Sequence, residues 1–252
     1  TITPQTPLHF IPEEYGLSST ILQRIDSIAL DGIRQGAYPG CQIVVMKDGH
    51  LMVDKTFGTH SGEGSNRVQP TDVYDLASLS KTTGTLLALM KLYDKGRFNL
   101  TDKISYYLPF LQRTNKKDIT IQELLYHQSG LPSGIALYQE AIDKDSYEGR
   151  LFSARKDAHH SVQLGTSTWA NPKFEFKKEY VSPIEKDGYT LQISDSLWLN
   201  PTFLKEMEKK IVEAPMKLKT YTYSDVGFVL LRLLVEELAG VPMDTYLQRE
   251  FY

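Results

Sequence analysis

Apolar residues along the chain recur in a few regular patterns, and these predict most of the secondary structure. Steps of three and four residues or longer apolar runs predict helices over residues 16–36, 78–95, 201–212 and 223–239. Two strand-like runs, 41–47 and 51–57, flank Asp48 and Gly49. A short Asp-Gly step between such runs is typical of a β-hairpin with a tight turn. The front of the chain is therefore expected to fold as a helix followed by a hairpin.

Other stretches carry weaker signals. Thr120 and Glu123 have the spacing of a capping box, directly before an apolar run, so a helix should begin there. Residues 174–193 are expected to hold a pair of strands around the turn at 186–188, whereas 135–168 is polar and irregular. One early hairpin among many helices predicts an α/β fold of the α+β sandwich kind, not a repeating βαβ unit.

Composition narrows the classes of partner. The 252 residues carry a net charge of −3, with 41% hydrophobic and 23% charged residues, as in an ordinary globular protein. No excess of positive charge suggests nucleic acid, and the apolar runs are too short for a membrane span. Cys41 is the only cysteine, so no disulfide forms within the chain. The spacing of His, Cys, Asp and Glu matches no metal site, and no metal or other cofactor is expected.

The two ends of the sequence suggest how it is organised. Residues 1–14 are rich in proline and resemble a linker, and 15–252 is expected to form one domain. The chain stops at Tyr252 immediately after a helical pattern. We therefore expect it to be part of a longer protein, with an upstream domain as one further expectation.

Candidate chemistry begins with the pattern Ser-x-x-Lys, which occurs twice. Ser78 opens a long apolar helix, so Lys81 should lie on the same helical face and reach its hydroxyl. The helix N-terminus would add positive potential beside the reacting oxygen. Ser153 and Lys156 lie in a polar stretch with no apolar helix behind them. Ser78 is the candidate nucleophile; its alternative is a helix N-cap beside a solvated lysine.

Three further blocks accompany Ser78 and Lys81 in a characteristic order: residues 39–45, 124–132 and 223–231. Together they resemble the serine β-lactamase and penicillin-binding protein family, in particular class C β-lactamases with related esterases and D-peptidases. The resemblance implies a β-lactamase/transpeptidase-like fold, an antiparallel sheet with a helical lobe. It implies a serine hydrolase that acts through an acyl-enzyme on an amide or ester. The substrates to expect are cell-wall D-peptides, small esters or β-lactams.

The resemblance also assigns residues. Ser78 becomes the acylated nucleophile, and Lys81 and Tyr223 share the transfer of its proton. Asp225 stands where the family usually has asparagine and would contact Lys81 and substrate. An ionised aspartate accepts but cannot donate hydrogen bonds, which argues against penicillin as the substrate. His127 is expected to have a packing role.

One family element has no match: nothing after Tyr223 resembles its Lys-Thr-Gly or His-x-Gly strand. We expect the sheet to be incomplete in this chain, and a swapped dimer or a complementing fragment would then complete it. The chain alone would in that case be inactive. A slow penicillin or muropeptide sensor, or an inactive module of a larger envelope enzyme, is the alternative to a hydrolase. The family likeness implies a location that is periplasmic or otherwise exported.

Overall fold

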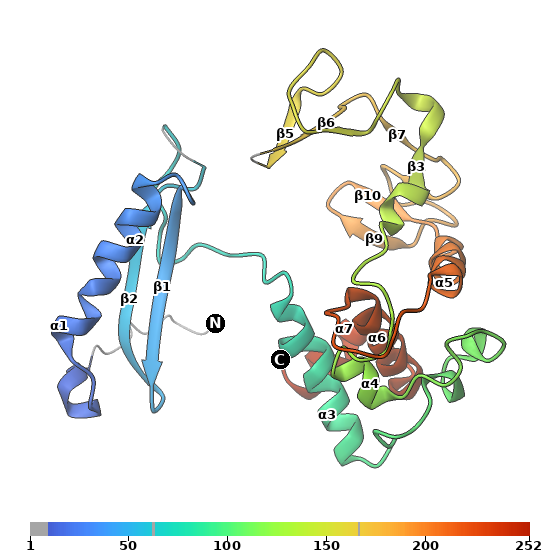
Figure 1. Cartoon of the computed structure of the whole chain (residues 1–252), viewed down its shortest axis with the longest axis horizontal. Coiled ribbons are helices and arrows are strands. Elements are labelled where there is room, and N and C mark those ends of the chain that lie inside the picture. The colour runs from blue at the N-terminus through green and yellow to red at the C-terminus, as the bar shows by residue number, and fades with distance from the viewer. Residues whose placement is uncertain (1–9, 62–63, 166) are drawn as a thin grey trace. The chain divides into compact units, whose positions relative to one another are not determined.

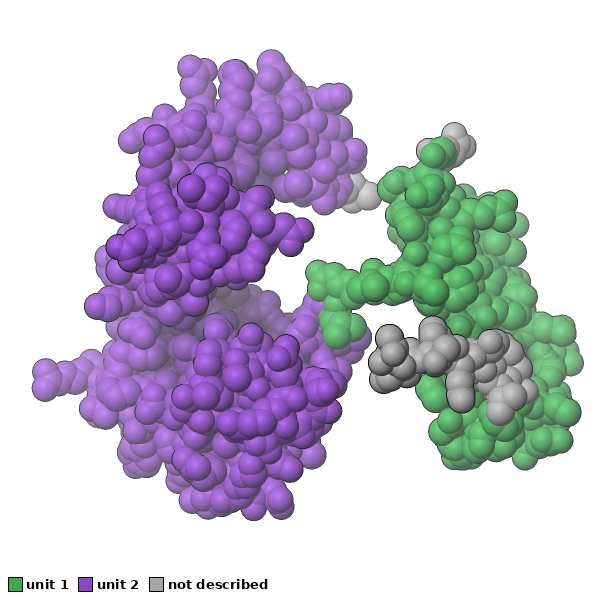
Figure 2. Space-filling model, turned by 180° about the vertical axis from the view of Figure 1, so that it is seen from behind, with its two compact units in different colours: residues 1–76 green, residues 77–252 purple. Residues whose placement is uncertain are grey.

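The computed structural model describes residues 10–61, 64–165 and 167–252, and its contacts divide the chain into the units 1–76 and 77–252 (Figures 1 and 2). Most of the linker-like lead, residues 1–9, lies outside the described residues. The first element among the described residues is a short 3-10 helix, η1 (Pro12–Tyr15).

Unit 1 contains the predicted helix and hairpin. The helix forms as two pieces, α1 (Ser19–Leu22) and α2 (Arg24–Arg34). The antiparallel strands β1 (Gly40–Lys47) and β2 (His50–Gly58) follow, so the hairpin prediction is confirmed. Both turn residues, Asp48 and Gly49, have positive φ angles, 50° and 78°, as a two-residue hairpin turn of this hand requires.

Helix α2 packs against β2 through its apolar face. Ala29 on this face is fully buried, and Met52 and Val53 of β2 are nearly so. On the polar side, Lys55 Nζ lies 2.7 Å from a carboxylate oxygen of Asp26. Within the described residues, β1 and β2 form a sheet of two strands.

Unit 2 is built around helices that surround one apolar core. Residues 79–94 are helical, first through the π-helical segment η2 (Lys81–Leu86) and then α3 (Leu87–Asp94). The other core helices are α4 (Ile121–Leu125), α6 (Asp225–Ala239) and α7 (Met243–Glu250). The predicted capping box at Thr120 is present, and α4 begins after it. The largest group of core side chains comes from α6: Val226, Leu230, Leu231, Leu234 and Val235.

A region of short elements separates α4 from α6. Its 3-10 turns are η5 (Leu137–Ala141) and η6 (Lys144–Ser146), whereas η3 (Ile104–Tyr106) and η4 (Pro109–Leu111) lie earlier, between α3 and α4. The strands are β3 (Ile142–Asp143), β4 (Phe152–Ser153), β5 (Val162–Gly165), β6 (Thr168–Ala170), β7 (Glu175–Phe176), β8 (Val181–Ser182), β9 (Leu191–Ser194) and β10 (Leu197–Leu199). The predicted amphipathic helix follows as α5 (Phe203–Glu213).

The strand pairing in this region corrects one prediction. The strands are arranged as β4-β6-β5, β3-β7 and β8-β10-β9. The turn at 186–188 closes only an isolated bridge between Lys186 and Tyr189, and both β8 and β9 pair with β10. The partner strand lies beyond residue 193, where the apolar run Leu197–Leu199 supplies a central strand. Across the described residues, no helix combines the length and apolar character needed to span a bilayer.

Candidate active site

Ser78 lies at the mouth of the helix that covers residues 79–94, and the backbone around it is unusual. Ala77 directly before it has a φ of 44°, in the left-handed region. An alanine there is strained by roughly 1–2 kcal/mol, and such residues cluster at functional sites. Directly after it, the helix is wound as a π-helix from Lys81 onwards, a form that is also frequent at functional sites.

The structure brings all four predicted site residues together. Lys81 Nζ donates a hydrogen bond to Ser78 Oγ over 3.1 Å, and the Tyr223 hydroxyl donates to the same oxygen over 2.9 Å. Lys81 Nζ also lies 2.6 Å from a carboxylate oxygen of Asp225. The hydroxyl of Ser78 is therefore the point where an ammonium and a phenol converge.

Tyr223 reaches this point because its segment is hydrogen-bonded to the loop after α4. The Lys217 N–H donates to the Gly130 carbonyl over 2.8 Å, and the Asp225 N–H donates to the Ser133 carbonyl over the same distance. Ser224 Oγ donates to the Pro132 carbonyl over 2.7 Å and caps α6 by accepting the Gly227 N–H. Tyr223 is thus the last residue before the cap of α6, not part of the helix as the apolar pattern predicted.

Gly130 permits the close approach of the two segments. Its φ is 78°, and a Cβ there would lie 2.5 Å from the Lys217 carbonyl oxygen. Any side chain would push the segment that carries Tyr223 away. The glycine in the 124–132 block therefore has a direct packing purpose.

The charges in the site shift two proton affinities in opposite directions. Burial by itself lowers the pKa of Lys81, but hydrogen bonds from the ammonium to Asp225 and Tyr223 outweigh it, and the net pKa is raised. Hydrogen bonds from Lys81 and from Ser78 lower the pKa of the Tyr223 phenol. Lys81 Nζ also lies 5.1 Å from the centre of the Tyr223 ring and 5.8 Å from that of Phe228. The lysine is held as an ammonium, and the phenol is the group whose ionisation becomes easier.

The exposure of the side chains shows which groups face solvent. The Lys81 side chain is 17% exposed, whereas that of Asp225 is 60% exposed and Tyr223 is 42% exposed. Beside Asp225 lies a small cavity of about 90 Å³ whose walls include the apolar Ile135, Leu137 and Val229. The exposed groups of the site are thus a carboxylate and a phenol, and the carboxylate also borders an apolar recess.

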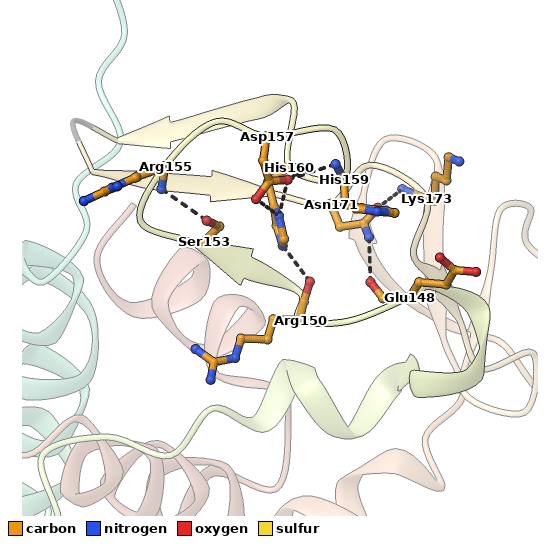
Figure 3. A network of polar contacts seen from close by, with 9 residues as sticks. All are labelled: Glu148, Arg150, Ser153, Arg155, Asp157, His159, His160, Asn171 and Lys173. Atoms are coloured by element: carbon orange, nitrogen blue, oxygen red, sulfur yellow. Dashed lines mark hydrogen bonds and ion pairs between the residues drawn. The ribbon is translucent and has the colours of Figure 1, made fainter.

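The second Ser-x-x-Lys tetrapeptide folds differently (Figure 3). Ser153 lies in the two-residue strand β4, and its Oγ accepts the N–H of Arg155 over 3.2 Å. Lys156 Nζ lies 5.5 Å from the centre of the Trp169 ring, as in a cation–π contact. This serine and its lysine belong to separate local contacts.

The polar network beside Ser153 centres on the imidazole of His160 (Figure 3). Its Nδ1 lies 2.7 Å from a carboxylate oxygen of Asp157, and its Nε2 lies 2.8 Å from the carbonyl oxygen of Arg150. Both nitrogens face acceptors, so the protonated ring fits best. The hydrogen bond to Asp157, followed by that to Arg150, raises the pKa of His160. This network ties the loop between β4 and β5 together.

His127 was expected to have only a packing role, and sequence reasoning missed its polar contacts. Its imidazole Nδ1 accepts the N–H of Ser224 over 3.0 Å, directly after Tyr223. The signal that could have indicated it is its place in the 124–132 block, within reach of the turn. Among the described residues, His, Cys, Asp and Glu side chains form no group of three or more able to hold a metal ion.

The hairpin, the helical unit and the serine at a helix mouth together define a β-lactamase/transpeptidase-like fold with mixed helices and antiparallel sheets. The chain belongs to the β-lactamase family, whose family model matches residues 25–252.

Individual relatives agree with this membership. The chain is 28% identical over 193 residues to a Staphylococcus aureus protein named Protein flp. The alignment covers 75% of this chain and 38% of that protein. It is 26% identical over 248 residues to the N-acetylmuramyl-L-alanine amidase of Bacillus subtilis, covering 93% of this chain and 45% of that protein. The chain therefore spans less than half the length of these relatives.

Solved structures show the same fold. An octameric penicillin-binding protein homologue from Pyrococcus abyssi superposes with a TM-score of 0.58 at 21% identity. That superposition covers 91% of this chain and 42% of the other.

Proposed function

We propose that this chain carries the site of a serine hydrolase that cleaves an amide or ester through an acyl-enzyme at Ser78. The observation that carries the proposal is the convergence of Lys81 Nζ and the Tyr223 hydroxyl on one oxygen, Ser78 Oγ, at 3.1 and 2.9 Å. A serine hydroxyl needs a base that removes its proton during attack. The phenol with its lowered pKa is the better candidate for that base, because the ammonium of Lys81 is stabilised in its charged form.

Acylation follows from this arrangement. Once Tyr223 is ionised, its hydrogen bond with Ser78 reverses, and the serine donates to the phenolate. Ser78 Oγ attacks the substrate carbonyl carbon while its proton passes to the Tyr223 oxygen. When the tetrahedral intermediate collapses, the bond to the leaving group breaks, and Tyr223 returns the proton to the leaving nitrogen or oxygen. Lys81 keeps its proton throughout and stabilises the phenolate.

Deacylation uses the same groups in reverse. A water molecule attacks the acyl carbon and gives its proton to the Tyr223 phenolate. The Ser78 oxygen leaves and recovers that proton, which regenerates the free hydroxyl. The backbone N–H of Ser78, at the helix mouth, is placed to donate to the developing oxyanion.

Asp225 supports a preference among substrates. It neutralises Lys81 through the 2.6 Å ion pair, so this pair brings no net positive charge to the site. An asparagine would leave the ammonium uncompensated and attract a carboxylate on the substrate. We therefore infer neutral amides and esters of the cell-wall kind, not penicillins with their free carboxylate. The Bacillus relative is named an N-acetylmuramyl-L-alanine amidase, so amides of this kind are the first to test. Because such substrates belong to the cell wall, we also propose an exported location.

The experiment that tests the proposal is labelling of this chain with a fluorophosphonate probe, followed by peptide mass spectrometry. We expect the adduct at Ser78 and its loss in Ser78→Ala. The matched control is Ser153→Ala, which removes the serine of the other Ser-x-x-Lys pattern and should leave labelling unchanged. Turnover of an ester by the same protein, before it is labelled, supports the hydrolase. Stable acylation by penicillin without turnover favours the sensor instead. A chain that never reacts at Ser78 contradicts the hydrolase and the sensor and favours the inactive module of a larger envelope enzyme.

The substrate preference has its own variant. Asp225→Asn should raise the kcat/KM for an anionic ester relative to its neutral isostere by about tenfold, because it uncovers the charge of Lys81. Lys156→Gln, which removes an exposed charge elsewhere, is the control. An unchanged ratio in Asp225→Asn would contradict the inferred preference.

A further inference from the structure

His127 holds the chain on both sides of Tyr223. Its backbone carbonyl accepts the N–H of Thr222 over 2.8 Å, and its ring Nδ1 accepts the N–H of Ser224 over 3.0 Å. Thr222 and Ser224 are the two neighbours of Tyr223 in the chain. A single residue therefore fixes the peptide units that flank the phenol.

The backbone of His127 is adapted to this double contact. Its φ is 55°, in the left-handed region, directly after the helical turn of α4, and its N–H donates to the Leu124 carbonyl over 3.1 Å. Histidine, asparagine and aspartate tolerate this conformation better than most residues. The conformation lets one residue direct both its carbonyl and its ring toward the segment of Tyr223.

The ring of His127 also supports the phenol ring itself. The centres of the His127 and Tyr223 rings are 4.6 Å apart, and the ring planes make an angle of 38°. The ring of Phe228, on α6, lies 5.4 Å from the imidazole. Tyr223 is 42% exposed, and the imidazole of His127 covers part of its ring.

We propose that His127, as a neutral imidazole protonated on Nε2, is the positioning residue that holds the Tyr223 oxygen at hydrogen-bonding distance from Ser78. The proposal rests on the proposed function, since it concerns the base of that reaction. It follows that protonation of Nδ1 removes the acceptor for the Ser224 N–H and loosens the phenol.

The groups around the ring determine the direction of its titration. Two charged groups face it: Lys81 from η2 and Asp225 from α6. Two tyrosines, Tyr221 and Tyr223, have their rings against it. Burial first, and then the positive charge of Lys81, lower the pKa of His127, and Asp225 opposes them only in part. The neutral ring is thus the folded form, and its support is lost as the pH falls through the lowered pKa.

The test compares three variants for the rate at which the fluorophosphonate probe labels Ser78 across pH. His127→Ala removes the ring and should label about a hundredfold more slowly at pH values above the lowered pKa of His127, the effect of a reacting group misplaced by about an ångström. Below that pKa the difference should shrink, because the protonated wild-type ring has lost the same acceptor. His127→Asn keeps an acceptor oxygen and the tolerance of positive φ but cannot titrate near neutral pH. We expect His127→Asn to retain most of the labelling rate. The fall of that rate at low pH that the titration of His127 causes in the wild type should disappear. The exposed His159 provides the control, because His159→Asn makes the same chemical change elsewhere.

A second readout does not require the chemistry to work. The Ser224 amide, observed by NMR, should be protected from exchange in the wild type and in His127→Asn, and exposed in His127→Ala and at low pH. If Ser78 never labels but the Ser224 amide follows His127, the proposed hydrolase fails and the positioning role stands. If His127→Ala labels at the wild-type rate above the pKa of His127, or His127→Asn keeps the same fall of the rate at low pH, the positioning role is overturned.

Discussion

The same four-residue pattern occurs twice in this chain and folds into two different environments. Ser78 and Lys81 are three residues apart at a helix, where this spacing places them on one face, and the amine lies 3.1 Å from the hydroxyl. Ser153 is the last residue of strand β4 and Lys156 lies in the loop beyond it, so no helical turn brings the two side chains to one face. The serine bonds to the backbone of Arg155, and the lysine lies against Trp169. The secondary structure around the tetrapeptide therefore decides whether its lysine reaches its serine.

The two regions also differ in what reaches them from elsewhere in the chain. Ser78 receives the hydroxyl of Tyr223 from 145 residues away, and Lys81 receives the carboxylate of Asp225. The region of Ser153 is organised mostly by its own neighbours, through His160, Asp157 and Arg150. Three comparisons of matched variants test whether this difference is real.

The largest effect is expected for the two lysines. Lys81→Met should reduce the labelling rate of Ser78 by about 10²–10⁴-fold, because the phenol of Tyr223 loses the charge that lowers its pKa. Its rate should then rise only at higher pH than in the wild type. Lys156→Met should match the wild type at all pH values. Equal rates in both variants would show that the ion pair with Asp225 is merely structural.

Two glycines provide the next comparison. Gly130 and Gly149 share a φ of 78°, but a Cβ would lie 2.5 Å from the Lys217 carbonyl at Gly130 and meets nothing within 4 Å at Gly149. Gly149→Ala should lower the free energy of unfolding by about 1 kcal/mol, through backbone strain alone. Gly130→Ala should lower it by about 3 kcal/mol, since overpacking adds to that strain. Denaturant unfolding measures both, and similar values would mean that the Lys217 segment yields easily.

The smallest effect concerns two histidines whose pKa values shift in opposite directions. The hydrogen bonds to Asp157 and Arg150 raise the pKa of His160, so its contribution to local stability is present at low pH and lost as the pH rises through the raised value. His127 has a lowered pKa and behaves in the opposite way. Amide exchange, corrected for its intrinsic pH dependence, should show the 150–160 loop opening as the pH rises above the pKa of His160. The Ser224 amide should open as the pH falls below the pKa of His127.

His160→Gln provides the reference for this last comparison. It should flatten the pH dependence of the 150–160 loop and leave that of the Ser224 amide unchanged. A loop whose corrected exchange is already independent of pH in the wild type would contradict the charged state assigned to His160.

Much of the local structure follows from the sequence alone. The hairpin turn at Asp48 and Gly49, the capping box at Thr120 and the helices ending before Gly96 and Gly240 are where the patterns predict them. These features depend on residues close in the chain, whose preferences for capping, turns and periodic burial act locally. The order of four motif blocks also predicted the β-lactamase family, which the match over residues 25–252 confirms.

The pairing of distant segments had to come from the tertiary structure. The strand β10 takes both β8 and β9 as partners, which the turn at 186–188 did not indicate. The positive φ of Ala77, the π-helical turn at Lys81 and the two contacts of His127 around Tyr223 are also invisible to periodicity. The pairing of β10 and the contacts of His127 depend on hydrogen bonds between residues that are not neighbours in the chain. The sequence thus determined which groups are candidates for the chemistry, and the tertiary structure decided their distances and proton affinities, because both depend on neighbours that the local pattern does not contain.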